Sequence, residues 1–288
     1  MDFYSFLIQV LNSIQYGLLL FLVASGLTLV FGIMGIINLA HGAFYMVGAY
    51  LAFGLSSLTG SFVLAILLGI PLMLVIGALL EWALFSFLYK RDHLEQVLLT
   101  YGLILIFEEI RSLIAGDDVH GVAIPEWVSA SIPLGDTMSY PVYRLVISGA
   151  CILLAAGLFF LIQKTRLGML IRAGSHDRDM VQSLGFNIDL IYRTVFALGV
   201  ALAGFAGMLA APVSSVFPGM GAQVLIVSFV IVVIGGIGSV WGALFAALLV
   251  GFADTFGKVF VPDFSGVIVY ILMAAVLLWR PEGIFSKR

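Results

Sequence analysis

The chain has 288 residues, of which 62% are hydrophobic and only 10% are charged, whereas soluble globular proteins carry about 25% charged residues. Its 13 basic and 16 acidic side chains are too few to cover a soluble protein of this size, which excludes a soluble enzyme. A net charge of −3 gives no basic surface for nucleic acid. The composition therefore predicts an all-α, polytopic protein of the lipid bilayer.

Apolar runs long enough to cross a bilayer recur along the chain. A spanning helix needs about 20 mostly apolar residues, and such runs cover residues 7–32, 36–56, 62–89, 95–115, 142–163, 192–212 and 266–280. The first run follows Asp2 and no basic residue, so we expect a mature helix rather than a cleaved signal peptide.

The stretch 222–256 is too long for a single span. It is interrupted between Gly235 and Ser239, which predicts two helices, or two half-helices, that meet at a glycine turn. We therefore expect one transmembrane domain over residues 1–288, with about eight or nine spanning helices and some of them broken at glycine turns.

The distribution of charge predicts the orientation, because short cytoplasmic loops are enriched in Lys and Arg. Ten of the 13 basic residues lie at Lys90 and Arg91, within 164–193, and from Arg280 onward. The segment 116–140 holds four acidic residues and no basic one, so we expect it to form an external hairpin. The C-terminus is then cytoplasmic. Nine full crossings would place the N-terminus outside. If one segment is re-entrant, charge does not determine on which side of the membrane the N-terminus lies.

Two polar residues flank the first glycine-rich segment. Asn38 and His41 are three positions apart and are expected to project into a shared interior beside Gly42. Uncharged polar groups beside exposed backbone amides suit a path for a zwitterion. They equally suit a role in capping the backbone of a broken helix. The second glycine segment supplies the other candidate path residues, Gly235, Gly236 and Gly238.

Ionisable residues within predicted spans are functional candidates by default, because charges are rare there, and we consider Glu81, Glu108, Glu109 and Arg111. Glu108 and Arg111 are spaced to pair on one helix face next to Glu109, either as a structural ion pair or as part of a gate. Glu81 has no basic neighbour in its own helical turn. We expect it to bond another helix or a freed backbone group, with a solute-path role as the alternative.

The segment 164–193 is the longest polar stretch, with about 30 residues where a connection between helices needs 2–8. Within it, Asp177 is predicted to cap a short helix that Gly185 ends, with an apolar face made by Met180, Val181 and Leu184. Such a helix suits docking into a groove on a partner, or lying on the lipid interface. The candidate docking residues are Asp177, Arg178, Asp179, Met180, Val181, Leu184 and Gly185.

The sequence shows no pattern for chemistry of its own. The one Gly-Lys pair, Gly257-Lys258, lacks the preceding glycine loop and the following Ser or Thr of an ATP-binding P-loop. The four histidines are far apart, so no metal site is predicted. We therefore expect no catalytic residues, no metal and no cofactor in this chain.

Three motifs resemble the permease subunits of branched-chain amino-acid ABC importers. The run GLTLVFGIMGIINLAHGAF at 26–44 is similar to the first-helix motif of that family, and GGIGSVWGA at 235–243 is similar to its second glycine motif. The run DMVQSLG at 179–185 resembles the Glu-Ala-Ala-x-x-x-Gly loop that contacts the ATPase, with Asp in place of Glu and Met-Val in place of Ala-Ala.

The resemblance implies a bacterial inner-membrane importer in which this chain joins a second, related permease, two cytoplasmic ATP-binding subunits and a periplasmic solute-binding protein. ATP would be used by the partners, and the solute would be a branched-chain or other hydrophobic amino acid. The resemblance extends to relatives that carry urea or short amides. A self-contained channel or ion-coupled carrier is the alternative of a different class, and would have to use Glu81 or Glu108 as its ion site.

Overall fold

The computed structural model describes residues 2–135 and 138–285. Its helices are α1 (Phe3–Met34), α2 (His41–Thr59), α3 (Phe62–Ala83), α4 (His93–Ala115), α5 (Val142–Lys164), α6 (Arg166–His176), α7 (Arg178–Ser183), α8 (Ile188–Ser214), α9 (Met220–Gly235), α10 (Val240–Phe260) and α11 (Ser265–Trp279). A two-stranded antiparallel hairpin is formed by β1 (Ser131–Leu134) and β2 (Met138–Pro141). The all-α prediction is confirmed, with this hairpin as a small exception.

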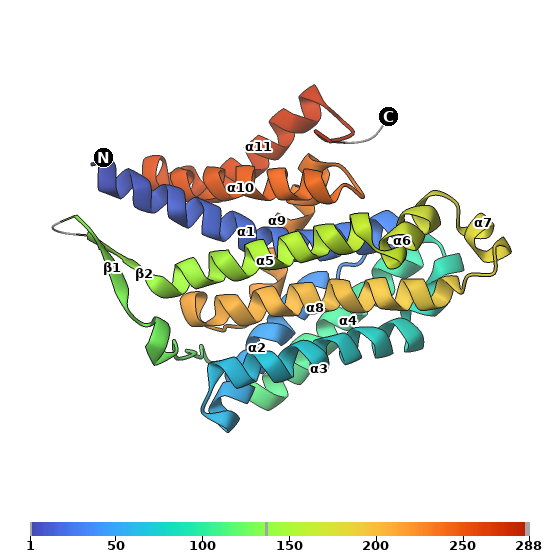
Figure 1. The fold of residues 1–288 in the computed structure, drawn as a ribbon, viewed down its shortest axis with the longest axis horizontal. Coiled ribbons are helices and arrows are strands. Elements are labelled where there is room, and N and C mark those ends of the chain that lie inside the picture. The colour runs from blue at the N-terminus through green and yellow to red at the C-terminus, as the bar shows by residue number, and fades with distance from the viewer. Residues whose placement is uncertain (1, 136–137, 286–288) are drawn as a thin grey trace.

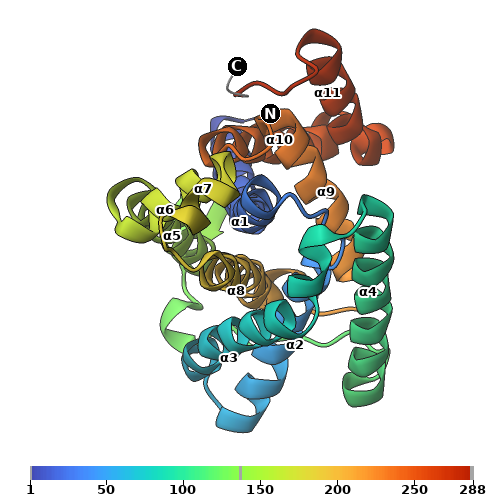
Figure 2. The same cartoon turned by 90° about the vertical axis from the view of Figure 1, so that its right-hand side faces the viewer.

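The long helices form one bundle that runs between two ends (Figure 1). One end carries the N-terminus and the β-hairpin, and the other carries α6, α7 and the carboxyl end of α11. Figure 2 views the bundle along its length and shows α1 and α8 in the middle, with α4 and α11 at the periphery. Within the most apolar window, 83% of residues are buried in both α1 and α8, compared with 22% in α3 and α5. The core therefore lies around α1 and α8.

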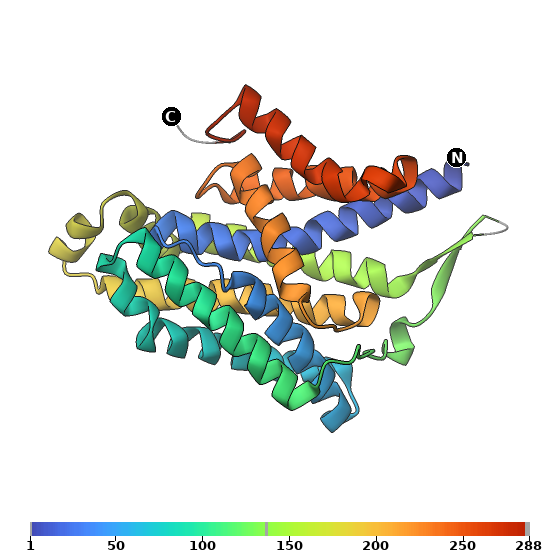
Figure 3. The same ribbon diagram turned by 180° about the vertical axis from the view of Figure 1, so that it is seen from behind.

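Seven helices within the described residues have the length and apolarity of a membrane span. They are α1, α2, α3, α5, α8, α10 and the last helix, counted from Pro262. α4 has 23 residues but carries charges near both its ends. α9 has 16 residues and crosses the bundle obliquely, as Figure 3 shows. The predicted break in 222–256 is confirmed, because α9 ends at Gly235 and α10 begins at Val240.

The predicted helix over 62–89 is wrong at its carboxyl end. α3 ends at Ala83, and Phe85–Lys90 forms a 3₁₀ turn instead. The turn buries Phe85 completely, with its ring centroid 4.3 Å from that of Phe196 on α8. Burial of a large side chain against a neighbouring helix overrides local helix preference here. The predicted helix over 36–56 also begins later than expected. α2 begins at His41, after an irregular stretch from Gly35.

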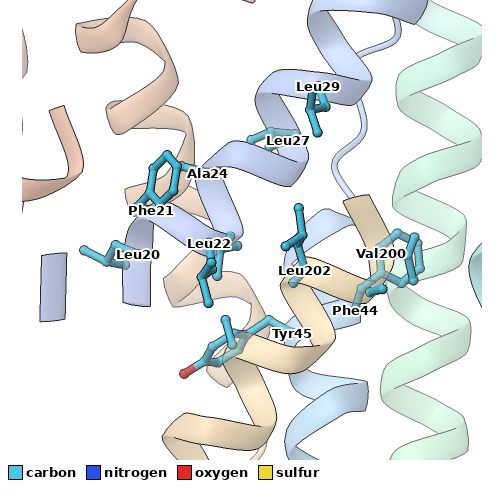
Figure 4. Close-up of a cluster of buried hydrophobic side chains, with 14 of the residues drawn as sticks. Leu20, Phe21, Leu22, Ala24, Leu27, Leu29, Phe44, Tyr45, Val200 and Leu202 are labelled. Atoms are coloured by element: carbon cyan, nitrogen blue, oxygen red, sulfur yellow. The ribbon is translucent and has the colours of Figure 1, made fainter. Parts of the chain in front are cut away.

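Apolar side chains of α1, α2 and α8 fill the centre of the bundle (Figure 4). Leu22, Leu27 and Phe44 have no exposed surface. The ring of Phe44 lies edge-on to Phe107 of α4 and Phe196 of α8, with centroids 5.8 Å and 6.0 Å away. One aromatic cluster therefore joins α2, α4 and α8.

The backbones of α2 and α8 touch at Gly48 and Gly204. A Cβ atom added to Gly48 would lie 2.0 Å from the carbonyl oxygen of Gly204, so only glycine permits this contact. Such small-residue contacts hold helices together in lipid.

Replacing Gly48 by Ala is expected to force α2 and α8 apart and to destabilise the folded chain by about 1–3 kcal/mol. Unfolding of the detergent-solubilised chain measures this loss. Gly54 of α2 has no atom within 4 Å of such a Cβ, so Gly54→Ala is the control and is expected to be neutral or slightly stabilising. Equal stability of the two variants would contradict the proposed helix contact.

Candidate functional site

The structure brings the two glycine-rich segments into contact near the carboxyl end of α1. A Cβ atom added to Gly32 would lie 2.6 Å from the Cα atom of Gly238. Gly236 and Gly238 both have positive φ angles, of 93° and 79°, which L side chains rarely adopt. The glycine turn before α10 thus requires these residues and packs directly on α1.

Asn38 and His41 are both fully buried. His41 Nε2 lies 2.9 Å from the carbonyl oxygen of Val23, and since a carbonyl only accepts, Nε2 is the protonated nitrogen and donates. Within the described residues, His41 Nδ1 and both side-chain polar atoms of Asn38 have no hydrogen-bond partner. Neither side chain caps the start of α2. These two side chains are therefore buried next to the first glycine segment with part of their hydrogen-bonding capacity unused.

Gly42 and Gly235 serve helix contacts. A Cβ atom on Gly42 would lie 2.2 Å from the carbonyl oxygen of Gly221 on α9, and one on Gly235 would lie 2.5 Å from the carbonyl carbon of Gly242 on α10. The structure therefore places the six candidate path residues in and around the α1–α2 and α9–α10 junctions, with the glycines in packing positions and the polar side chains buried.

The predicted pair of Glu108 and Arg111 is confirmed. Arg111 Nε lies 3.2 Å from a carboxylate oxygen of Glu108, and Arg111 Nη1 donates to Asp117 at 2.9 Å. This hydrogen bond and one from Ser112 hold the pKa of the Asp117 carboxyl below its usual range. Glu109 is exposed on the same helix. The cluster fixes the end of α4 to the segment that follows it.

Glu81 lies at the carboxyl end of α3 and is fully buried. One carboxylate oxygen accepts a hydrogen bond from Arg193 Nε of α8 at 3.0 Å, and the other accepts one from the hydroxyl of Tyr89. The expectation that Glu81 bonds another helix is confirmed. The sequence indicates neither partner, of which Tyr89 is 8 residues and Arg193 is 112 residues away along the chain.

Arg178 connects α7 to this buried cluster. Its guanidinium carbon lies 5.4 Å from the ring centroid of Tyr89 and 5.2 Å from that of Tyr192, within the range of a cation–π interaction. The two tyrosine rings are themselves 5.0 Å apart. A continuous set of contacts therefore leads from α7 through Tyr89 to Glu81 and Arg193, which join α3 to α8.

The short helix in 164–193 is formed as the sequence predicts. Asp177 Oδ1 accepts a hydrogen bond from the Met180 amide at 2.9 Å, and Gly185 has a φ of 85°. Met180, Val181 and Leu184 do not share one apolar face as expected, however. α7 ends at Ser183, so Leu184 lies beyond the helix. Val181 is 3% exposed, whereas Met180 and Leu184 are 59% and 67% exposed. Asp179 is also exposed.

α7 lies at the tip of the bundle end opposite the hairpin (Figure 1). Close to Met180 and Leu184 in the chain, Phe186 and Leu190 are also exposed apolar residues. Exposed apolar side chains beside charged ones are typical of a surface that binds another protein.

Residues of α1, α2, α5, α8, α9 and α10 line a cavity of about 500 Å³. Its lining includes Arg144, Asp254 and Lys258, none of which the sequence suggested as a site residue. Val23, which accepts the hydrogen bond from His41, also lines it. The cavity therefore reaches the residue that bonds the buried His41.

The sequence of the chain matches a known protein family. The family described as "Branched-chain amino acid transport system / permease component" matches residues 9–277. The permease protein BraD of Pseudomonas aeruginosa is 31% identical over 99% of this chain and 97% of its own length. The LivH permease of Escherichia coli K12 is 28% identical over the same shares. Both are named as permease proteins of high-affinity branched-chain amino acid transport systems.

A second kind of permease also matches. The LivM protein of Salmonella typhimurium is 26% identical over 90% of this chain and 66% of its own length. No solved structure matches the chain. Because the family matches nearly the whole length, the chain belongs to the permease components of branched-chain amino acid transport systems.

Proposed function

We propose that this chain is the membrane-spanning subunit of an ATP-driven importer for branched-chain or other hydrophobic amino acids. The observation that carries the proposal is the projecting helix α7, which exposes Met180, is followed directly by the exposed Leu184, and contacts two tyrosines of the core through Arg178. A helix built in this way can receive a partner and transmit its movement.

The proposed cycle uses contacts that link α7 to two spanning helices. Cytoplasmic ATPases bind α7 and move it as they bind and hydrolyse ATP. Arg178 passes that movement to Tyr89 and Tyr192, and the pair of Glu81 and Arg193 couples α3 to α8. Because α8 packs at the centre beside α1 and α2, a shift in α8 changes access around the glycine junctions.

The sides of the membrane follow from charge. The α7 end carries the basic segment 164–193 and is assigned to the cytoplasm of a bacterial inner membrane. The hairpin end faces the periplasmic solute-binding protein, and the C-terminus is cytoplasmic. Resemblance to both LivH and LivM, named for the same kind of system, supports a related second permease as partner. Two ATP-binding subunits complete the complex, and this chain itself needs no cofactor.

A channel or ion-coupled carrier is less well supported. Glu81 is bound to Arg193, and Glu108 is bound to Arg111. Both candidate ion sites are therefore occupied by arginine side chains in this structure, while the projecting α7 has no role in a self-contained carrier.

Replacing Gly185 by Val is expected to uncouple ATP hydrolysis from uptake. The φ of 85° at Gly185 is strained for a β-branched residue by about 1–3 kcal/mol, so the chain after α7 must rearrange. Uptake of radiolabelled leucine per ATP hydrolysed, measured in proteoliposomes, should fall while the chain stays folded. Gly121→Val at the hairpin end is the control, since Gly121 has no positive φ and no atom close to an added Cβ. Full coupling in Gly185→Val would contradict the role given to this loop.

Co-purification tests the composition of the complex. The tagged chain is solubilised from its native membrane, and the proteins that accompany it are identified by mass spectrometry. We expect a second permease and ATP-binding subunits. Recovery of the chain alone, with leucine flux retained after reconstitution without ATP, would overturn the proposal.

A further inference from the structure

The cavity between α1, α8 and α10 has features of a binding site for a small solute. Its volume of about 500 Å³ lies in the range of small-molecule sites, roughly 300–1,000 Å³. The lining residues on α1 run from Gln9 to Val23, which corresponds to about 21 Å of helix. The hydrocarbon core of a bilayer is about 30 Å thick, so the cavity extends well into the membrane.

The polar lining of the cavity comes from segments at the hairpin end. These are the amino-terminal half of α1, the start of α5 and the carboxyl-terminal parts of α8 and α10. These four segments lie together at the end with the β-hairpin (Figure 1). On the proposed topology this is the side on which the binding protein releases its solute.

Two positive charges line the cavity, and of these Arg144 has a neutral hydrogen-bond partner. Arg144 Nη1 donates to the side-chain oxygen of Asn12 at 2.6 Å. Within the described residues, Arg144 has no carboxylate within 4.0 Å. A guanidinium is a planar donor fork that matches a carboxylate, and a neutral amide oxygen does not satisfy it. Arg144 is therefore available to an incoming carboxylate.

The negative charge in the cavity has an exchangeable partner. Asp254 is 17% exposed and lies 2.6 Å from Lys258, whose side chain is 61% exposed. Because the Lys258 side chain is mostly exposed, water can solvate its ammonium group when it leaves the carboxylate. An incoming ammonium group can replace that of Lys258 at the Asp254 carboxylate.

The inner part of the cavity is apolar. Leu19, Leu20 and Val23 of α1 line it together with Val224 of α9. A cation for the carboxylate, a carboxylate for the ammonium group and an aliphatic surface in one cavity match the three parts of a branched-chain amino acid. Glutamine and asparagine side chains in the lining add neutral hydrogen-bonding groups.

We propose that this cavity is the entry chamber of the importer, where Arg144 binds the carboxylate and Asp254 the ammonium group of a zwitterionic amino acid whose side chain rests on the aliphatic surface. The proposal rests on the proposed function and adds residues to it. A solute in this chamber lies next to Val23, whose carbonyl accepts the hydrogen bond from the buried His41.

The test uses the whole importer in proteoliposomes, with its ATPases, second permease and saturating leucine-loaded binding protein. Leucine uptake and ATP hydrolysis are measured in the same vesicles. Arg144→Gln and Asp254→Asn are each expected to lower uptake per ATP at least about tenfold, the effect of losing one hydrogen bond to a charged group. Arg144→Lys keeps the charge and should recover part of the loss. Asp263→Asn, at an exposed residue beyond α10 and outside the cavity, is the control.

The outcomes separate this proposal from the proposed function. Absence of ATP-driven leucine uptake by the unmodified complex would refute the proposed function. Uptake by the unmodified complex, together with a normal uptake-to-ATP ratio in either Arg144→Gln or Asp254→Asn, would refute only the chamber. A loss confined to these variants supports it.

A second measurement does not depend on the folding of those variants. Cys151 is the only cysteine and is fully buried, so Thr255→Cys adds one accessible thiol to the cavity lining. Excess leucine, without the binding protein, is expected to slow labelling of this thiol by a membrane-impermeant maleimide. Val119→Cys, exposed outside the cavity, should be labelled at an unchanged rate. An unchanged rate at Thr255→Cys as well would overturn the proposal.

Discussion

Replacing Glu81 by Gln is expected to destabilise the chain by about 3 kcal/mol, the lower end of the range for breaking a buried ion pair. Glu81 has no exposed surface, and the change leaves the charge of Arg193 without its partner. The lower end applies because the Arg193 side chain is 35% exposed and retains some contact with solvent. Unfolding in mixed detergent micelles measures the change.

The control is Glu95→Gln. Glu95 forms a pair with Arg91 in which both side chains are more than half exposed, so the expected loss is at most about 1 kcal/mol. A double change, Glu81→Met with Arg193→Met, removes both charges and should restore much of the stability. If Glu81→Gln is no less stable than Glu95→Gln, the buried pair does not hold α3 to α8.

The double variant also separates stability from coupling. If the pair transmits movement from α7, the apolar replacement folds but takes up less leucine per ATP than the native chain. Normal coupling in a stable double variant would assign the pair a purely structural role.

Replacing Leu184 by Asp is expected to weaken association with the ATP-binding subunits at least about tenfold, as for an apolar anchor at the centre of an interface. Leu184 is 67% exposed, so the stability of the chain itself should change by no more than about 0.5 kcal/mol. Pull-down of the purified ATPase by the detergent-solubilised chain measures the association.

Val119→Asp is the matched control for Leu184→Asp. Val119 is likewise 67% exposed, but it precedes the β-hairpin at the other end of the bundle. We expect its variant to bind the ATPase normally. Normal ATPase binding by Leu184→Asp would show that Leu184 is not part of the docking surface.

Features that depend on local sequence could be predicted. The break between α9 and α10 follows from three glycines in four residues, because Gly236 and Gly238 adopt positive φ angles. The start and end of α7 follow from a capping carboxylate at Asp177 and a left-handed glycine at Gly185. The pair of Glu108 and Arg111 follows from helical spacing.

Features that depend on distant partners could not be predicted. The 3₁₀ turn after α3 depends on the packing of Phe85 against Phe196, which lies 111 positions further along the sequence. Nothing in the sequence around Glu81 indicates Arg193 as its partner. Nothing around Arg144 indicates Asn12, which is 132 positions away. Hydropathy locates spans, but it does not show which face of each helix meets another. The cavity therefore became visible only once the helices were assembled.

ATP-driven uptake of leucine by the reconstituted complex tests the central claim most directly. Proteoliposomes that contain this chain, a second permease and the ATP-binding subunits are supplied with leucine-loaded binding protein, with ATP either present or absent. We predict accumulation of leucine only when ATP and every partner are present, and none with this chain alone. Leucine flux through this chain alone without ATP would contradict the claim that it is the permease subunit of an ATP-driven importer.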